Sequence, residues 1–377
     1  MHPVARTPDE WRELLTAVSE RPFRAAQVFR WIHQRGVMDP SAMTDLGRGL
    51  RERLGELGLS DPLTVREVRR SRDGTRKLLL EVRGGGLVEC VLIPMSRPGA
   101  DEEDADAAAA SLDPDDVPNS RERVTLCIST QHGCAMGCVF CASGRAGLQR
   151  GLGPEEIVAQ VLIAKRYLTP EEDLRNLVFM GMGEPLQHYE VTRRAIELIT
   201  HPDGLGMSPR RITVSSVGLV GGIRRLGEDF AGKVGLAISL HAPDNETRSR
   251  LIPINERYPV EELMRALRAY PLPRRRRITI EYTLIDGVNA SLDHARRLAI
   301  LLRGLRVKVN LIPMNPVEGA GLTAPPAAAV AAFRAHLHAA GVSCFVRVRR
   351  GDDVDAACGQ LALKGEPIRL RRGRPAD

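Results

Sequence analysis

Three cysteines stand close together in the segment Cys134-Ala-Met-Gly-Cys138-Val-Phe-Cys141, at the spacing C-x3-C-x2-C. Thiolates are soft ligands, and closely spaced cysteines in one loop are typical of iron–sulfur clusters. Three thiolates bind three irons of a four-iron cube, so the fourth iron receives no protein ligand from this loop. Electron transfer alone does not need an open iron, whereas activation of a bound substrate does. The spacing therefore predicts a cluster that takes part in chemistry.

Structural zinc is the main alternative for these cysteines. A structural zinc site takes four ligands, usually from two paired motifs. This chain has only one such loop, and His132 lies next to it rather than at a ligand spacing. A disulfide is disfavoured because three is an odd number and no secretory signal pattern is present.

Two other cysteines invite a chemical interpretation. Cys127 lies seven residues before the loop, and Cys358 lies in a glycine-containing segment near the C-terminus. Neither fits the cluster spacing, so each is either a buried core thiol or one of a redox or nucleophilic pair. Cys90 and Cys344 are flanked by apolar residues and are expected in the core.

The elements that position these residues alternate from residue 123 onward. Six predicted strands, each followed by a predicted helix, indicate an α/β fold with a parallel sheet that curls into a partial, open (β/α)6 barrel. A short seventh strand follows at 343–348. The six strands are expected at 124–129, 177–180, 212–215, 234–239, 278–284 and 307–312, and the helices at about 154–168, 188–200, 219–229, 259–270, 290–303 and 325–340.

Polar residues follow several of these strands. In parallel βα folds, ligands bind at the carboxyl ends of the strands. The strand ends here carry Gly181-Met-Gly-Glu-Pro185, Ser215-Ser216, Ser239-Leu-His241 and Pro313-Met-Asn-Pro316. Each is an ordinary loop on its own, but together they predict a pocket for a polar cofactor that meets the open iron.

The N-terminal part is predicted to contain a helical module followed by three strands, rather than alternating strands and helices. Thr7 and Glu10 predict a capping box at the start of a small helical module, and alternating apolar residues over 63–94 predict three strands. Glu89 lies inside the third strand and is expected on its solvent face. The polar faces of the helices carry arginines that either contact RNA or are simply solvated: Arg24, Arg30, Arg48, Arg51 and Arg53.

Charge and composition suggest the partner and the domain organisation. The net charge is +7, although residues 98–120 carry eight acidic side chains and no Lys or Arg. The rest of the chain is therefore strongly basic, which suits either RNA or a merely soluble basic protein. No apolar run spans a membrane, so a cytoplasmic protein is expected. The predicted divisions are a helical accessory domain at 1–60 with RNA contacts, a β extension at 61–96, an acidic disordered insertion at 97–121, the barrel with a catalytic C-terminal loop at 122–362 and a basic tail at 363–377.

The motifs together resemble one family. The three-cysteine loop with a following Gly-Glu loop is similar to radical S-adenosylmethionine (SAM) enzymes. Five wider motifs resemble the RlmN/Cfr family of RNA adenine methyltransferases over about residues 10–362. They are Cys127-Ile-Ser-Thr-Gln-His-Gly-Cys134, Gly181-Met-Gly-Glu-Pro-Leu186, Ser239-Leu-His-Ala-Pro243, Ile252-Pro-Ile-Asn255 and Arg350-Gly-Asp-Asp-Val-Asp-Ala-Ala-Cys358-Gly-Gln360.

The resemblance implies a role for each matching residue. Cys134, Cys138 and Cys141 match the ligands of a [4Fe-4S] cluster. Cys358 matches the cysteine that becomes S-methylated, Cys127 its redox partner and Glu89 the proton acceptor. The SAM-binding positions match Gly183, Glu184, Ser215, Ser239, Leu240, His241 and Asn315.

The implied mechanism consumes two SAM molecules. One SAM methylates Cys358, and the second is cleaved reductively to a radical that takes hydrogen from that methyl group. The resulting methylene radical adds to the adenine ring. Loss of the ring proton to Glu89 lets Cys127 attack Cys358, which leaves a disulfide and methylated RNA.

The resemblance also implies substrates and partners. The expected activity is C2 methylation of an adenine in the peptidyl transferase centre of 23S rRNA, and of an adenine next to the tRNA anticodon. The alternatives are C8 methylation of the same rRNA adenine, as in Cfr, and a non-enzymatic, metal-stabilised RNA-binding protein. A reducing electron donor such as flavodoxin or ferredoxin, a monomeric state and no membrane partner are expected.

Overall fold

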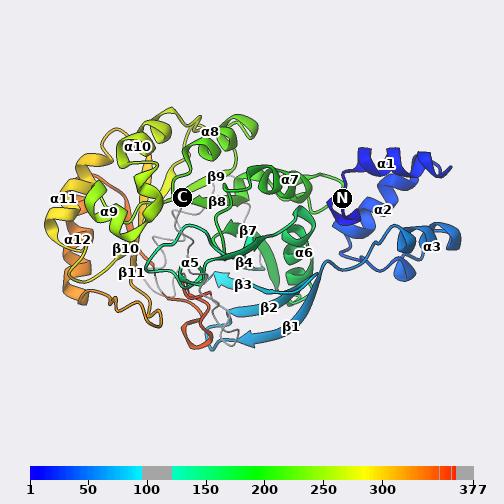
Figure 1. The fold of residues 1–377 in the computed structure, drawn as a ribbon, viewed down its shortest axis with the longest axis horizontal. Coiled ribbons are helices and arrows are strands. Elements are labelled where there is room, and N and C mark those ends of the chain that lie inside the picture. Colours follow the sequence, from blue (N-terminus) through cyan, green and yellow to red (C-terminus); the bar gives the residue numbers. More distant parts are fainter. Residues whose placement is uncertain (96–120, 348, 358, 362–377) are drawn as a thin grey trace, which may run out of the picture.

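The computed structural model describes residues 1–95, 121–347, 349–357 and 359–361. The predicted acidic insertion, apart from residue 121, lies outside these ranges, as do the basic tail and Cys358. The described strands form one ten-stranded sheet in the order β1-β2-β3-β4-β7-β8-β9-β10-β11-β12, and a separate pair, β5-β6 (Figure 1).

The parallel part of the large sheet runs from β4 to β12. Its strands are apolar enough to be covered on both faces, as a parallel sheet requires. The six predicted barrel strands occur in the predicted order, and the short seventh strand follows them, so the predicted α/β class is confirmed. The bounds are β4 (Glu122–Cys127), β7 (Glu172–Phe179), β8 (Ile212–Ser216), β9 (Gly235–Ser239), β10 (Ile278–Leu284), β11 (Val307–Pro313) and β12 (Cys344–Val346).

Helices cover the outside of this sheet (Figure 1). All six predicted helices are present, and α6 is buried along almost its whole length. Two further short helices among the described residues, α5 (Ala142–Ala146) and α9 (Asn245–Leu251), were not predicted. The six are α6 (Pro154–Lys165), α7 (Tyr189–Thr200), α8 (Val220–Asp229), α10 (Val260–Ala269), α11 (Leu292–Leu301) and α12 (Ala327–Ala339). Among the described residues, no helix is long and apolar enough to cross a membrane.

The predicted β extension continues the same sheet. The strands β1 (Leu63–Arg70), β2 (Arg76–Val82) and β3 (Leu87–Met95) are antiparallel neighbours, and β3 pairs antiparallel with β4. The barrel and the extension therefore share hydrogen bonds across one continuous sheet.

The N-terminal module contains α1 (Pro8–Ala17), α2 (Arg24–His33) and α3 (Arg48–Glu56) and projects beyond α6 and α7 (Figure 1). The predicted capping box is confirmed, because Thr7 Oγ1 accepts from the Glu10 amide and the Glu10 carboxylate accepts from the Thr7 amide. An ion pair between Arg30 and Asp203, at 2.9 Å, joins the module to the segment after α7.

Short elements complete the described chain. The strands β5 (Gln131–Gly133) and β6 (Leu148–Gly151) form an antiparallel pair that encloses the cysteine loop and α5 (Ala142–Ala146). Five 3-10 helices are η1 (Pro3–Ala5), η2 (Pro40–Ala42), η3 (Pro209–Arg211), η4 (Pro253–Glu256) and η5 (Asp352–Val354).

Candidate active site

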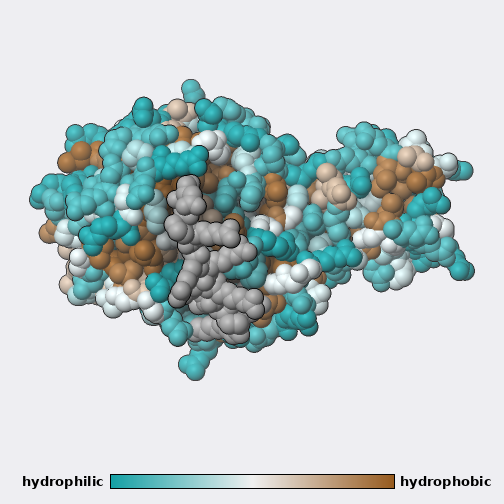
Figure 2. Space-filling view, in the orientation of Figure 1, coloured by the Kyte–Doolittle hydropathy of each residue, from teal (hydrophilic) through white to brown (hydrophobic). Residues whose placement is uncertain are grey.

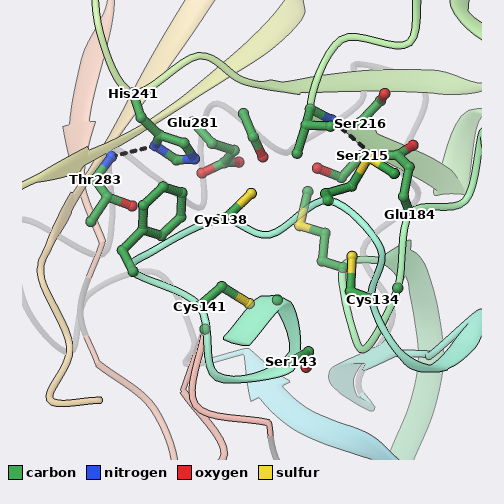
Figure 3. Close-up of a pocket in the computed structure, with 18 of the residues that line it drawn as sticks. Cys134, Cys138, Cys141, Ser143, Glu184, Ser215, Ser216, His241, Glu281 and Thr283 are labelled. Atoms are coloured by element: carbon green, nitrogen blue, oxygen red, sulfur yellow. Dashed lines mark hydrogen bonds between the residues drawn. The ribbon is translucent and has the colours of Figure 1, made fainter. Parts of the chain in front are cut away.

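A cavity lies at the carboxyl ends of the parallel strands, where sequence analysis placed a pocket (Figure 3). Nine of the ten residues predicted to bind the cluster or SAM line it; Leu240 does not. The nine are Cys134, Cys138, Cys141, Gly183, Glu184, Ser215, Ser239, His241 and Asn315.

The three cysteines line one side of this cavity, as Figure 3 shows. Burial raises the pKa of the Cys134 thiol to about 12 and raises the pKa of both other thiols. Thiols in such surroundings become thiolates only when a cation compensates the charge. Three such thiols around a shared cavity therefore fit the iron atoms of a cluster.

Backbone contacts hold the cysteine loop from three directions. The Cys134 amide donates to Gly147 O at 3.1 Å, and the Val139 amide donates to Leu251 O at the end of α9 at 3.2 Å. The Ala142 amide donates to Gly359 O at 2.9 Å. The loop is therefore tied to the β6 turn, to α9 and to the C-terminal segment.

A single zinc ion fits these thiols less well than a cluster. All ligands of one zinc ion lie within about 2.3 Å of the same point, whereas the cysteines of a cluster bind different irons. In the part of the chain that the structure describes, no three His, Cys, Asp or Glu side chains are grouped to hold one metal ion.

The loop after β7 brings a carboxylate to the cavity. Gly183 has φ +102°, and a Cβ there would lie 2.6 Å from Gln131 Cβ, so a larger residue would not fit. The Glu184 carboxylate accepts from the amides of Leu186 and Val217, both at 2.9 Å. Burial raises the pKa of Glu184 to about 7, outweighing those two hydrogen bonds. A cationic group in the cavity would stabilise its charged form.

His241 follows β9 in a left-handed backbone conformation, with φ +56°. Its Nδ1 accepts from the Thr283 amide at 2.8 Å, and its ring meets the Phe140 edge with centroids 4.6 Å apart. Burial lowers the pKa of His241 to about 3, so the ring is neutral at pH 7. With Nδ1 accepting, the proton lies on Nε2, and the ring offers a donor.

Two buried charged residues near the cavity were missed by the sequence analysis. Glu281 on β10 lines the cavity and accepts from Asn310 Nδ2 at 2.9 Å. Arg248 on α9 is fully buried and donates from Nε to Leu240 O at 3.1 Å. Neither lies in a motif. The charge of Glu281 within the apolar strand β10 could have signalled that residue, whereas Arg248 lies in a mainly polar segment that offers no such signal.

Glu89 corrects an expectation. It was expected on the solvent face of its strand, but its side chain is only 4% exposed, because the Lys77 ammonium lies 3.0 Å from Glu89 Oε1. Cys127 is also buried, at the end of β4. Neither residue lines the cavity described above. Cys358 lies outside the described residues, while Gly359 lines the cavity.

The fold and the site define a radical SAM enzyme. The model of the Radical SAM superfamily matches residues 128–299. A crystal structure of a radical SAM methyltransferase from Sphaerobacter thermophilus superposes with a TM-score of 0.85 at 41% identity, over 96% of this chain and 99% of that one. Membership of this superfamily implies a [4Fe-4S] cluster and SAM as cofactors.

The comparisons also identify the family. The model of the ribosomal RNA large subunit methyltransferase N-terminal domain matches residues 6–58. A dual-specificity RNA methyltransferase RlmN from Sorangium cellulosum is 59% identical over 99% of this chain and 98% of its own length. Another, from Anaeromyxobacter dehalogenans, is 45% identical over 95% and 91%. The chain belongs to the RlmN family of radical SAM RNA methyltransferases.

Proposed function

We propose that this protein methylates C2 of an adenine in the peptidyl transferase centre of 23S rRNA and of an adenine next to the tRNA anticodon. The observation that carries the proposal is 59% identity, over essentially the whole chain, to a dual-specificity RNA methyltransferase. The alignment spans the N-terminal module as well as the barrel, because it covers 99% of this chain and 98% of the relative.

In this proposal Cys134, Cys138 and Cys141 hold the cluster. The burial of all three thiols beside one cavity supports that role. The bound cluster and SAM supply a radical that removes hydrogen from a methyl group. Residues that bind and orient SAM are Gly183, Glu184, Ser215, Ser239, Leu240, His241 and Asn315. For Leu240 the support is indirect, because its backbone oxygen accepts from Arg248 while its side chain is buried.

Three further residues act on the RNA in this proposal. Cys358 carries the methyl group, Glu89 accepts the adenine C2 proton as a carboxylate, and Cys127 attacks the Cys358 sulfur to release the product. The antiparallel register supports a shared location for two of them. Cys127 is directly opposite Val91, and Glu89 is two residues from Val91 on the same face of β3.

The remaining partners follow from the chemistry. Each catalytic cycle needs an electron to cleave SAM, so a low-potential donor such as flavodoxin or ferredoxin is proposed. A monomer acting in the cytoplasm, where its RNA substrates are found, is also proposed.

Product analysis tests the proposed function. The anaerobically reconstituted protein, given SAM, a reductant and unmodified 23S rRNA fragment or tRNA, should form 2-methyladenosine and 5′-deoxyadenosine, as measured by mass spectrometry of the digested RNA. Cys138→Ala should form neither product. Only 8-methyladenosine would overturn the proposed position, and RNA binding without 5′-deoxyadenosine would favour a non-enzymatic binding protein.

A further inference from the structure

The proposed proton acceptor, Glu89, shares one face of the sheet with Lys77, a residue that has no assigned role. Lys77 on β2 and Cys127 on β4 are both directly opposite Val91 on β3. Directly opposite residues of antiparallel strands project on the same face. Lys77, Val91 and Cys127 therefore form one row across three strands, and Glu89 lies one step along the same face.

Lys77 and Glu89 form a buried ion pair. Lys77 Nζ lies 3.0 Å from Glu89 Oε1, and both side chains are 4% exposed. The second carboxylate oxygen, Oε2, has no hydrogen-bond partner among the described residues. The carboxylate is thus held through Oε1, while the buried Oε2 has an unused capacity to accept a hydrogen bond or a proton.

The same ammonium group also holds the C-terminal loop, defined here as residues 351–357. Lys77 Nζ donates to Asp355 O at 3.1 Å. Two more contacts tie this loop to the β1–β2 turn. The Gly351 amide donates to Asp73 Oδ2 at 2.9 Å, and the Arg72 amide donates to Asp353 Oδ2 at 3.3 Å. Lys77 is the member of this set that contacts both the loop and Glu89.

We propose that Lys77 is a positioning residue for the methyl-transfer reaction, which keeps Glu89 ionised and fixes it beneath the C-terminal loop. The proposal rests on the proposed role of Glu89 as proton acceptor. In the step concerned, the adenine C2 proton passes to Glu89 Oε2, and the electron pair of the C–H bond stays in the ring. Lys77 acts through Glu89 and has no direct contact with the RNA.

The electrostatics of this face support the role. Burial raises the pKa of Glu89, while the charge and hydrogen bond of Lys77 lower it. Arg69 on β1 lowers the pKa further, and Asp355 in the loop raises it. Cys127 faces the same side from β4. Lys77 is the cation in direct contact, so its removal would leave a buried carboxyl group that favours its protonated form.

A neighbouring residue provides a matched control. Arg76 precedes Lys77 on β2 and projects on the opposite face. It forms a similarly buried ion pair with Glu172, at 2.5 Å. Lys77→Met and Arg76→Met each remove one cation from a buried pair on the same strand. Only Lys77→Met lies beside Glu89. The comparison therefore separates a general loss of stability from a specific effect on proton transfer to Glu89.

The experiment uses the full-length, cluster-loaded enzyme with tRNA and SAM. Single-turnover methylation by Lys77→Met should fall about tenfold on the acid side of the pH–rate profile, where protonation of Glu89 removes the general base. Because the pKa of Glu89 rises, the acid limb of the pH–rate profile should move by about one unit to higher pH. A covalent protein–RNA adduct should accumulate, because its release follows loss of the C2 proton, while 5′-deoxyadenosine still forms. Lys77→Arg, which keeps the charge, should restore part of the rate.

The controls distinguish the possible failures. Arg76→Met should show a lower melting temperature, an unchanged acid limb and no adduct. If Lys77→Met shows the same profile as Arg76→Met, the positioning role is wrong. If Glu89→Gln retains full methylation, the proposed role of Glu89 is wrong and this inference falls with it. An inactive Glu89→Gln together with a normal Lys77→Met would overturn only the role of Lys77.

Discussion

Arg248 is a buried cation that donates hydrogen bonds to neutral carbonyl and amide oxygens. Its guanidinium donates to Asn255 Oδ1 at 2.7 Å, to Leu240 O at 3.1 Å and to Ser239 O at 3.3 Å, and also to Val217 O. Burial lowers the pKa of Arg248 to about 10, so it stays charged at neutral pH. One side chain thereby joins the ends of β8 and β9, where four of the proposed SAM-binding residues lie: Ser215, Ser239, Leu240 and His241.

Replacing Arg248 tests this support. Arg248→Met removes the donors and leaves buried carbonyl groups without partners, which should lower the free energy of unfolding by about 3 kcal/mol. Urea unfolding measures that loss, and equilibrium dialysis should show weaker SAM binding by the cluster-loaded enzyme.

The control for Arg248 lies two residues away on the sequence. Arg250 is exposed at the end of the same helix, so Arg250→Met should change stability by less than about 0.5 kcal/mol. Equal losses for the two variants would contradict the assigned role of Arg248.

Among the elements, the β1–β2 turn and the C-terminal loop depend on each other. Partial burial raises the pKa of Asp73, but the hydrogen bonds from the Thr75 and Gly351 amides outweigh it and lower the pKa to about 2. Asp73 is therefore a carboxylate at neutral pH and accepts both bonds fully. Gly351 packs so closely that an added Cβ would lie 2.7 Å from Ala356 Cβ and 2.9 Å from Thr75 Cγ2.

A pair of glycine substitutions tests this contact. Gly351 and Gly341 both have left-handed backbone conformations, with φ +65° and +78°, but nothing lies within 4 Å of a Cβ built on Gly341. Both Gly→Ala changes should cost about 1 kcal/mol of backbone strain. Only Gly351→Ala should also displace the loop and reduce RNA methylation, by about tenfold or more.

Methylation assays at matched folded fraction, set by circular dichroism, provide the comparison. Equal activities of the Gly351→Ala and Gly341→Ala enzymes would show that the close packing of Gly351 has no part in positioning the loop.

At the scale of the whole molecule, the N-terminal module projects from the barrel (Figure 1). Its exposed arginines include Arg53 and Arg48, and Arg48 is paired with Glu52 at 2.8 Å. The face of the molecule in Figure 2 is largely hydrophilic, with hydrophobic patches on the barrel and on the module. Exposed arginines suit RNA, whose binding depends mostly on phosphate contacts.

We expect the arginines of α3 to contact phosphate. Arg48→Gln combined with Arg53→Gln should weaken tRNA binding, and each lost contact should reduce the slope of log K against log salt by about 1. Filter binding over a range of salt concentrations measures both effects. Cleavage of SAM without RNA should be unaffected, because the module is far from the cavity.

A matched pair at the other end of the molecule provides the control. Arg296, which pairs with Asp293 at 3.3 Å, and the exposed Arg303 lie on α11 and just after it. Changing both to Gln removes the same charge. A loss of affinity equal to that of the α3 variant would indicate a general effect of net charge rather than contacts at α3.

Much of the barrel could be predicted from the sequence, because its signals are local. The apolar runs of the strands, the cysteine spacing and the glycine-containing strand ends each lie within a short segment. The rule that ligands bind at the carboxyl ends of parallel strands then predicted one shared pocket, and nine of the ten predicted ligand positions line it. The short helix α9 was missed because seven mainly polar residues carry too little apolar periodicity to predict a helix.

The sequence by itself determined the class of chemistry, since three cysteines at a fixed spacing in one loop need no distant partner to be recognised. Only the tertiary structure decided the environment of Glu89 and Arg248. Glu89 is buried because β2 brings Lys77 beside it, and Lys77 in turn reaches Asp355, 278 residues away. The charge state of a carboxyl group depends on its burial and on its nearest charges. Both of these are set by contacts between segments far apart in the chain, which a linear pattern does not contain.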